Sequence, residues 1–156
     1  MNAPALSLFR LVYISRQTAD TAARLDAAVD SIITKAIDIN SRAGVTGLLI
    51  AAKGLFVQAL EGPRDAVHRI YSRIATDPRH VGARIISAGP ADARLFAEWF
   101  MCAGALGAVD KAILGVIDKK ESFEKSLMMS DNALRLLTVV AGIQRRTAEE
   151  AARRIG

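Results

Sequence analysis

Residues 55–63 have the sequence LFVQALEGP, and this stretch decides the fold. Five of its first six side chains are apolar, a pattern typical of a central strand that is covered on at least one side. Gln58 interrupts the run. Its amide has two donors and two acceptor lone pairs, and each buried group left unpaired costs about 1–3 kcal/mol. We therefore expect a polar partner opposite Gln58, either a protein group, which is the commoner case, or a bound ligand.

The composition limits the classes of protein to consider. The chain has 156 residues, of which 51% are hydrophobic and 24% charged, enough for one folded domain and an appendage. The net charge is +5, without a long block of Lys and Arg, which disfavours nucleic acid as a partner. The single Cys102 cannot form an internal disulfide, and neither a signal peptide nor an apolar run of about 20 residues is visible. We expect a cytoplasmic protein that does not contact a membrane.

Periodicity predicts the secondary structure around this stretch. Runs rich in β-branched and aromatic residues predict strands at residues 8–15, 45–52, 55–60 and 83–88. Apolar residues at helical spacing, among them Ile32, predict one helix from residue 22 to about 40 or 41. A second helix should run from Pro63 to Asp77. A helical turn and a fifth strand are expected within residues 96–103.

Local signals indicate where these elements begin and end. Asp20 or Thr21 is the expected cap of the first helix, and Gly44 lies just past its end. Gly54 is expected to supply a positive φ in a hairpin turn between the second and third strands.

The order β-α-β-β-α-β is that of the split βαβ, or ferredoxin-like, plan, an α+β fold with two helices on one face of the sheet. In this topology the first and third strands are neighbours at the centre of the sheet. Tyr13 and Gln58 would then lie on adjacent strands and could meet on the face that the helices cover.

Helical patterns follow Gly104, at residues 109–117, 127 to about 142, and 145–155. Thr147 to Glu150 resembles a capping box that would start the last of these helices. An apolar stripe is formed by Leu134, Leu137, Val140 and Ala141. We expect these helices to cover the open face of the sheet or to bind another subunit.

Other candidate site residues have ordinary explanations when each is taken alone. Asn40 ends a helix, where asparagine is a common cap. Arg79 and His80 lie on a loop, where such a pair can bind phosphate or a sugar hydroxyl but is more often solvated. Trp99 and Met101 share one face of the last predicted strand and could be core. Glycine-rich nucleotide loops, metal-ligand spacings and catalytic triads are absent from the sequence.

Five motifs in order resemble the BLUF family, the blue-light sensors that use FAD. The resemblance covers residues 8–103. The motifs are LVYIS at 11–15, Asn40 ahead of GVTGLL at 44–49, FVQALEG at 56–62, DPRH at 77–80 and FAEWFM at 96–101. The family implies a ferredoxin-like fold with the flavin ring between the two helices.

The resemblance also implies roles for individual residues. The implied cofactor contacts are Tyr13, Ile32, Asn40, Gln58, Arg79 and His80. Tyr13 would be the electron donor and Gln58 the switching amide, whereas Arg79 and His80 would help to hold the ribityl-phosphate part. Trp99 and Met101 match positions that pass the signal onward. FAD is the implied cofactor, with FMN as the alternative, and no metal is implied.

The resemblance divides the chain into a flavin-binding domain at residues 1–104 and a helical extension at 105–156, for output or oligomerisation. Short members of the family have no catalytic output domain. We therefore expect a photoreceptor that is not an enzyme, forms a homo-oligomer and acts on a downstream protein partner of unknown identity.

Three other functions are alternatives to the photoreceptor interpretation. An acylphosphatase-like enzyme could use Arg16 or Arg79 with Asn40 to hold phosphate, but its phosphate loop needs glycines, and residues 14–20 contain none. A nucleic-acid module would stack bases on strand aromatics, and aromatic residues make up only 5% of the chain. The third alternative is a flavin-binding scaffold without a light response. All the switch residues that the family implies are present, which argues against it.

Overall fold

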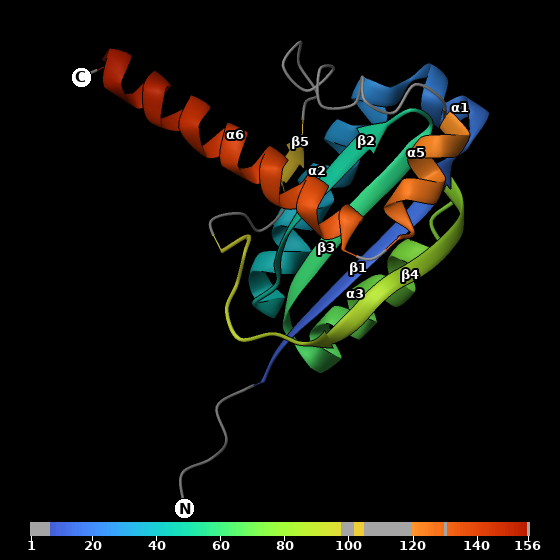
Figure 1. The fold of residues 1–156 in the computed structure, drawn as a ribbon, viewed down its shortest axis with the longest axis horizontal. Helices are drawn as coiled ribbons and strands as arrows, with labels where there is room; N and C mark the ends of the chain where they lie inside the picture. The colour runs from blue at the N-terminus through green and yellow to red at the C-terminus, as the bar shows by residue number, and fades with distance from the viewer. Residues whose placement is uncertain (1–6, 98–101, 105–119, 130, 156) are drawn as a thin grey trace, which may run out of the picture.

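The computed structural model describes residues 7–97, 102–104, 120–129 and 131–155. The chain forms an α+β fold on a five-stranded sheet with the order β4-β1-β3-β2-β5 (Figure 1). The strands are β1 (Leu8–Gln17), β2 (Thr46–Ala52), β3 (Leu55–Pro63), β4 (His80–Pro90) and β5 (Cys102–Gly104). The helices are α1 (Ala19–Ala23), α2 (Leu25–Ala43), α3 (Arg64–Ala75), α5 (Lys120–Leu127) and α6 (Asn132–Ile155). The predicted ferredoxin-like order is confirmed.

The central strands are β1 and β3, as the topology predicts. They pair antiparallel, and Tyr13 lies directly opposite Gln58 in the register. β3 also pairs antiparallel with β2 through a hairpin in which Lys53 and Gly54 have φ values of 50° and 77°. The short β5 runs parallel to β2, with Cys102 opposite Leu48. The side chains of β3 from Leu55 to Gly62 are all buried, so this strand is covered on both faces.

Each face of the sheet has its own hydrophobic core. The core under α2 and α3 contains Leu11, Tyr13, Leu49, Phe56, Leu60, Val67 and Ile70. The core of the opposite face contains Val12, Leu48, Ile50, Val57 and Ala59, together with side chains of α6. Figure 1 shows the start of α6 lying across this face of the sheet. The alternation of side chains along the strands assigns successive residues to opposite cores.

The first helix begins differently from the prediction. Neither Asp20 nor Thr21 caps it. Thr18 is the cap, and its hydroxyl accepts a hydrogen bond from the backbone N–H of Thr21 at 3.2 Å. The helix then breaks at Arg24, whose φ and ψ of −127° and 39° are not helical, and resumes as α2. The predicted end is confirmed, because Gly44 adopts a left-handed conformation with φ 71°.

The C-terminal helices also differ from the prediction. α6 is one continuous helix of 24 residues, so the expected break before Arg145 is wrong and Thr147 lies inside the helix instead of capping it. Leu127 ends α5 instead of starting a helix. The expected helix at residues 109–117 lies outside the described residues. Pairs of Arg and Glu four residues apart favour a continuous solvated helix. The helix therefore continues through Thr147 to Glu150, although these residues resemble a capping box.

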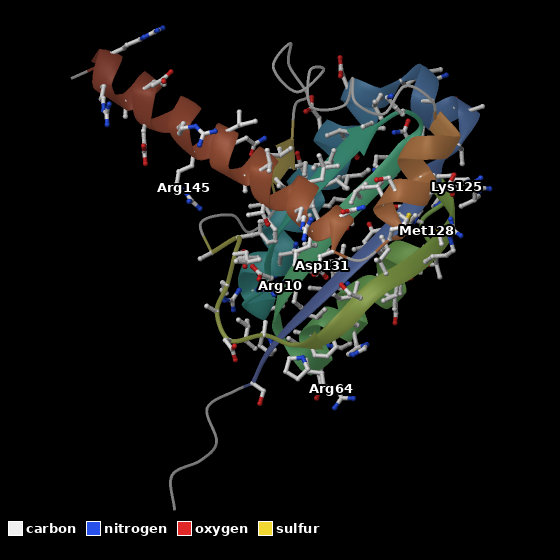
Figure 2. The ribbon with its side chains drawn as sticks, viewed as in Figure 1. Arg10, Arg64, Lys125, Met128, Asp131 and Arg145 are labelled. Atoms are coloured by element: carbon white, nitrogen blue, oxygen red, sulfur yellow. The ribbon has the colours of Figure 1, made fainter. Side chains whose placement is uncertain are left out.

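The first half of α6 covers the open face of the sheet. Leu137, Val140 and Ala141 are at most 3% exposed, and Leu134 is partly buried against the same core. The second half extends past the sheet and is exposed, with Arg145 on this part (Figure 2). Among the helices that the structure describes, we find none with the length and apolar character needed to cross a membrane.

Candidate functional site

A cavity of about 170 Å³ lies between α2 and α3 above the central strands. A water molecule needs only about 10–15 Å³ by the same kind of measure, so the space is sized for a larger molecule. The lining residues are Tyr13, Ile32, Lys35, Ala36, Ile39, Asn40, Leu49, Phe56, Gln58, Ile70, Arg73, Ile74, Asp77, Arg79 and His80. All six residues that the sequence predicts as cofactor contacts therefore border one space.

Tyr13 and Gln58 form the polar pair of this cavity. Each is 2% exposed, and the hydroxyl of Tyr13 donates a short hydrogen bond to Oε1 of Gln58. Burial raises the pKa of Tyr13 well above its ordinary value, and the nearby Tyr71 and Asp77 raise it further. The phenol is therefore protonated at neutral pH, and its proton already points at an amide oxygen.

Asn40 lies in the last turn of α2. Its backbone carbonyl accepts the N–H of Val45 at 2.9 Å, while its side chain borders the cavity. Among the 19 residues of α2, Asn40 alone is fully buried. Ile32 and Ala36 are only partly buried, although they face the sheet side of the helix. The apolar inner side of α2 thus both packs against the core and borders the cavity.

The loop between α3 and β4 closes one end of the cavity. The guanidinium of Arg79 donates two hydrogen bonds to the carboxylate of Asp77, from Nε to Oδ1 at 2.9 Å and from Nη2 to Oδ2 at 2.6 Å. These hydrogen bonds hold the pKa of Asp77 below its usual range. The fork fixes Arg79 at the cavity wall, where it is 27% exposed.

His80 is buried and engaged by the protein at both ring nitrogens. Nε2 lies 2.5 Å from the carbonyl oxygen of Ile74, and Nδ1 lies 2.6 Å from the hydroxyl of Ser15. A carbonyl only accepts, so Nε2 donates its proton to Ile74, while Nδ1 pairs with the Ser15 hydroxyl, which can donate or accept. His80 therefore contributes its ring to the cavity wall, with both nitrogens already bonded to protein.

The sequence reasoning missed some of the lining residues. Lys35 on α2 and Arg73 on α3 bring two cations to the cavity, in addition to Arg79. Charged residues on amphipathic helices have no signal that separates them from an ordinary solvated face. The sequence predicts Phe56 only as an apolar strand residue, because its place in the wall depends on how the strands pair. The predicted relay residues Trp99 and Met101 lie outside the described residues.

The donor set of the cavity fits a flat, polar aromatic ring with an anionic tail. The amides of Asn40 and Gln58 offer both donors and acceptors, as ring carbonyls and a ring N–H require. Ile32 and Phe56 supply apolar walls, and the three cations suit phosphate. Within the described ranges, no group of His, Cys, Asp and Glu side chains is placed to hold a metal ion. These residues fit a flavin nucleotide.

Comparison with solved structures supports the same kind of protein. The BLUF protein BlrB in its dark state is 28% identical, with a TM-score of 0.68 over 87% of this chain and 97% of that chain. The photo-activated state of BlsA has a TM-score of 0.73 over 86% of this chain and 94% of that chain, and at 24% identity it shows the shared fold.

Comparison by sequence gives the family. Photoactivated adenylate cyclase subunit beta of Euglena gracilis is 40% identical over 94 residues, which are 60% of this chain and 11% of that protein. The chain thus spans about a tenth of the length of this relative. The family model of the sensors of blue light using FAD matches residues 8–102. Because that match covers more than half of the sequence, the chain belongs to the BLUF family of blue-light sensors that use FAD.

Proposed function

We propose that Tyr13 and Gln58 are the light-triggered switch of this BLUF photoreceptor. The observation that carries the proposal is the hydrogen bond from the Tyr13 hydroxyl to Oε1 of Gln58, buried at the wall of the cavity between α2 and α3. FAD is the cofactor of the family, and this cavity offers it amides, apolar walls and cations.

The chemistry that FAD supplies when bound is that of an oxidant, strong enough under blue light to take an electron from a phenol. Once Tyr13 has lost an electron, its hydroxyl becomes a strong acid. Oε1 of Gln58 already accepts the hydrogen bond from this hydroxyl and is therefore placed to accept its proton. Oε1 of Gln58 would accept this proton and give it back when the electron returns to Tyr13, and the amide would be left rotated or as its tautomer. The lasting change is then a rearranged set of hydrogen bonds, which reverts in the dark.

The other lining residues hold the cofactor in this proposal. Asn40 bonds the polar edge of the ring, and Ile32 packs against its face. Arg79, fixed by its fork with Asp77, faces the ribityl-phosphate part together with Lys35. His80 packs with its ring and keeps the loop in position through Ser15 and Ile74, because both of its nitrogens are bonded to protein.

We further propose that output leaves through the helical extension at residues 105–156, to a protein partner or by a change in a homo-oligomer. The exposed second half of α6 supports this division of the chain. The Euglena relative is a photoactivated adenylate cyclase subunit, whereas we propose that this chain contributes sensing and not catalysis. A cytoplasmic location stays a prediction from the sequence.

The test is the absorption spectrum of the purified protein loaded with FAD. Blue light should shift the flavin band slightly to the red, with recovery in the dark. Tyr13→Phe and Gln58→Leu should bind flavin and lose the shift. Tyr71→Phe is the matched control, because its ring centroid lies 5.4 Å from that of Tyr13 but its hydroxyl does not make the Gln58 bond.

The possible results separate the alternatives. A normal photocycle in Tyr13→Phe or Gln58→Leu would contradict the switch. A yellow protein without a shift would favour a flavin-binding scaffold. A protein that cannot be reconstituted with flavin would favour the acylphosphatase-like alternative.

A further inference from the structure

A buried carboxylate lies at the end of β3, three residues after Gln58. Glu61 is 0% exposed, and its oxygens accept hydrogen bonds from Nε of Arg10 at 2.7 Å and from the backbone N–H groups of Leu95 and Phe96 at 3.0 and 2.8 Å. Nη2 of Arg10 (Figure 2) donates to the carbonyl of Ala93 at 2.7 Å. We call Glu61, Arg10 and residues 93–96 the Glu61 clamp.

Arg94 fastens the same segment to its surroundings by other contacts. Its guanidinium donates to the hydroxyl of Thr46 at 2.8 Å, to the carbonyl of Gly44 at 2.8 Å and to the carbonyl of Glu61 at 3.0 Å. The segment is thus tied to the end of α2, the start of β2 and the end of β3. These are three of the elements that frame the flavin cavity on the other side of the sheet.

The clamp seats Phe96 in the core under α6. Phe96 is 0% exposed and belongs to the same hydrophobic cluster as Leu137 and Val140 of α6. Along the chain, residues 98–101 follow directly and include the predicted relay residues Trp99 and Met101.

Gln58 and Glu61 lie on opposite faces of one strand, because side chains alternate and the two are three residues apart. The Gln58 side borders the cavity, and the Glu61 side meets the clamp. A displacement of the β3 backbone moves both groups together. The hydrogen bonds of the clamp are short and charge-assisted, so they respond to such a displacement more steeply than apolar contacts do.

We propose that Glu61 is a positioning residue that couples the flavin cavity to residues 93–97 and through them to α6. The inference depends on the proposed function, because it names how the state of Gln58 leaves the cavity. In the dark the clamp is closed, as in this structure. In the signalling state it loosens, and the N–H groups of Leu95 and Phe96 lose their acceptor.

The role requires a carboxylate and not just a polar side chain. An ionised Glu61 offers only acceptors to the N–H groups that converge on it, whereas an amide would turn an NH₂ group toward one of them. Glu61→Gln therefore keeps the size of the side chain but loses the acceptor that faces Nε of Arg10, which weakens the clamp. The pair is only partly buried, with the Arg10 side chain 18% exposed, and such ion pairs give little net stability compared with apolar packing, which favours a role in specifying position.

The experiment measures amide hydrogen exchange of Leu95 and Phe96 by NMR, in the dark and under blue light, in the FAD-loaded full chain. In the wild-type protein, light should raise both exchange rates. In Glu61→Gln, dark exchange should be faster by up to about tenfold, and the difference between light and dark should shrink. The red shift of the flavin should persist, because Glu61 does not border the cavity.

Glu124→Gln is the matched control. Glu124 is also a carboxylate that binds two arginines, Arg16 at 3.0 Å and Arg84 at 2.7 Å, but it does not contact residues 93–96. It should leave the exchange of Leu95 and Phe96 as in the wild type. If Glu61→Gln does not fold, Arg10→Lys is the substitute. A lysine cannot bind Glu61 and the carbonyl of Ala93 with two separate nitrogens as Arg10 does, so this variant should show the same changes to a smaller extent.

Two results overturn the coupling. One is an unchanged exchange of these amides under light in the wild type, and the other is an undiminished difference between light and dark in Glu61→Gln or in its substitute. Absence of a red shift in the wild type would instead overturn the proposed function. The two failures are distinguishable, because the flavin spectrum and the amide exchange are separate readouts.

Discussion

Replacing Leu137 with alanine tests whether α6 closes the face of the sheet opposite the flavin cavity. Leu137 is 0% exposed and shares a core cluster with Leu48, Ile50 and Val57 of the sheet. A fully buried Leu→Ala change loses about 2–5 kcal/mol, from the lost burial and the cavity that remains. We expect a value near the middle, about 3 kcal/mol, a large part of the roughly 5–15 kcal/mol that stabilises a domain.

Urea unfolding of the FAD-loaded protein, followed by far-UV circular dichroism, measures this loss. Val139→Ala is the control, because Val139 lies on the same helix but is 44% exposed. A surface substitution of this kind should change the free energy of unfolding by less than about 0.5 kcal/mol. If Leu137→Ala were as mild as the control, α6 would not pack on the sheet in solution, and the packing argument would be wrong.

Three further predictions follow from single contacts. Because burial raises the pKa of Tyr13 above its ordinary 10.0, stability should be lost as the pH rises past 10, by up to about 1.4 kcal/mol per pH unit, and Tyr13→Phe should remove that part of the slope in alkaline unfolding. Gly62→Ala should lose about 1–3 kcal/mol in urea unfolding, because the added Cβ would lie 2.8 Å from the carbonyl oxygen of Gly44. The hydrogen bonds from Arg79 lower the pKa of Asp77 below 3.8, so the advantage of the wild type over Asp77→Asn should hold above pH 3.8 and fade below it in acid unfolding.

The sequence was sufficient for the central part of the fold because the decisive signals there are local. Gln58 stands out as a polar residue within an apolar run, and the order of the elements places Tyr13 on the neighbouring strand beside it. The end of α2 could be predicted, since Gly44 supplies a conformation that other residues avoid. These signals need no knowledge of distant contacts.

The rest depended on contacts between residues far apart in the chain. Nothing in the sequence marks Glu61 as buried, and only the return of residues 93–96 makes it a buried acceptor. Lys35 and Arg73 carry no sequence signal of a site, and the packing of α2 and α3 brings them to one cavity. Thr147 and Glu150 are three residues apart, the spacing of a capping box, but the Arg and Glu pairs four residues apart around them suit an uninterrupted helix, which α6 is.

The separation of the two cores restricts how light could act on the C-terminal helices. The core around Tyr13 and the core under α6 share no side chain, because alternation along the strands keeps them on opposite faces. A change at Gln58 can therefore reach α6 only through the backbone of the strands or around the end of the sheet, and Glu61 lies on the route through β3. This geometry orders the variants: changes at Gln58 should abolish the spectral shift and everything that follows it, whereas changes at Glu61 should leave the shift and remove only its transmission.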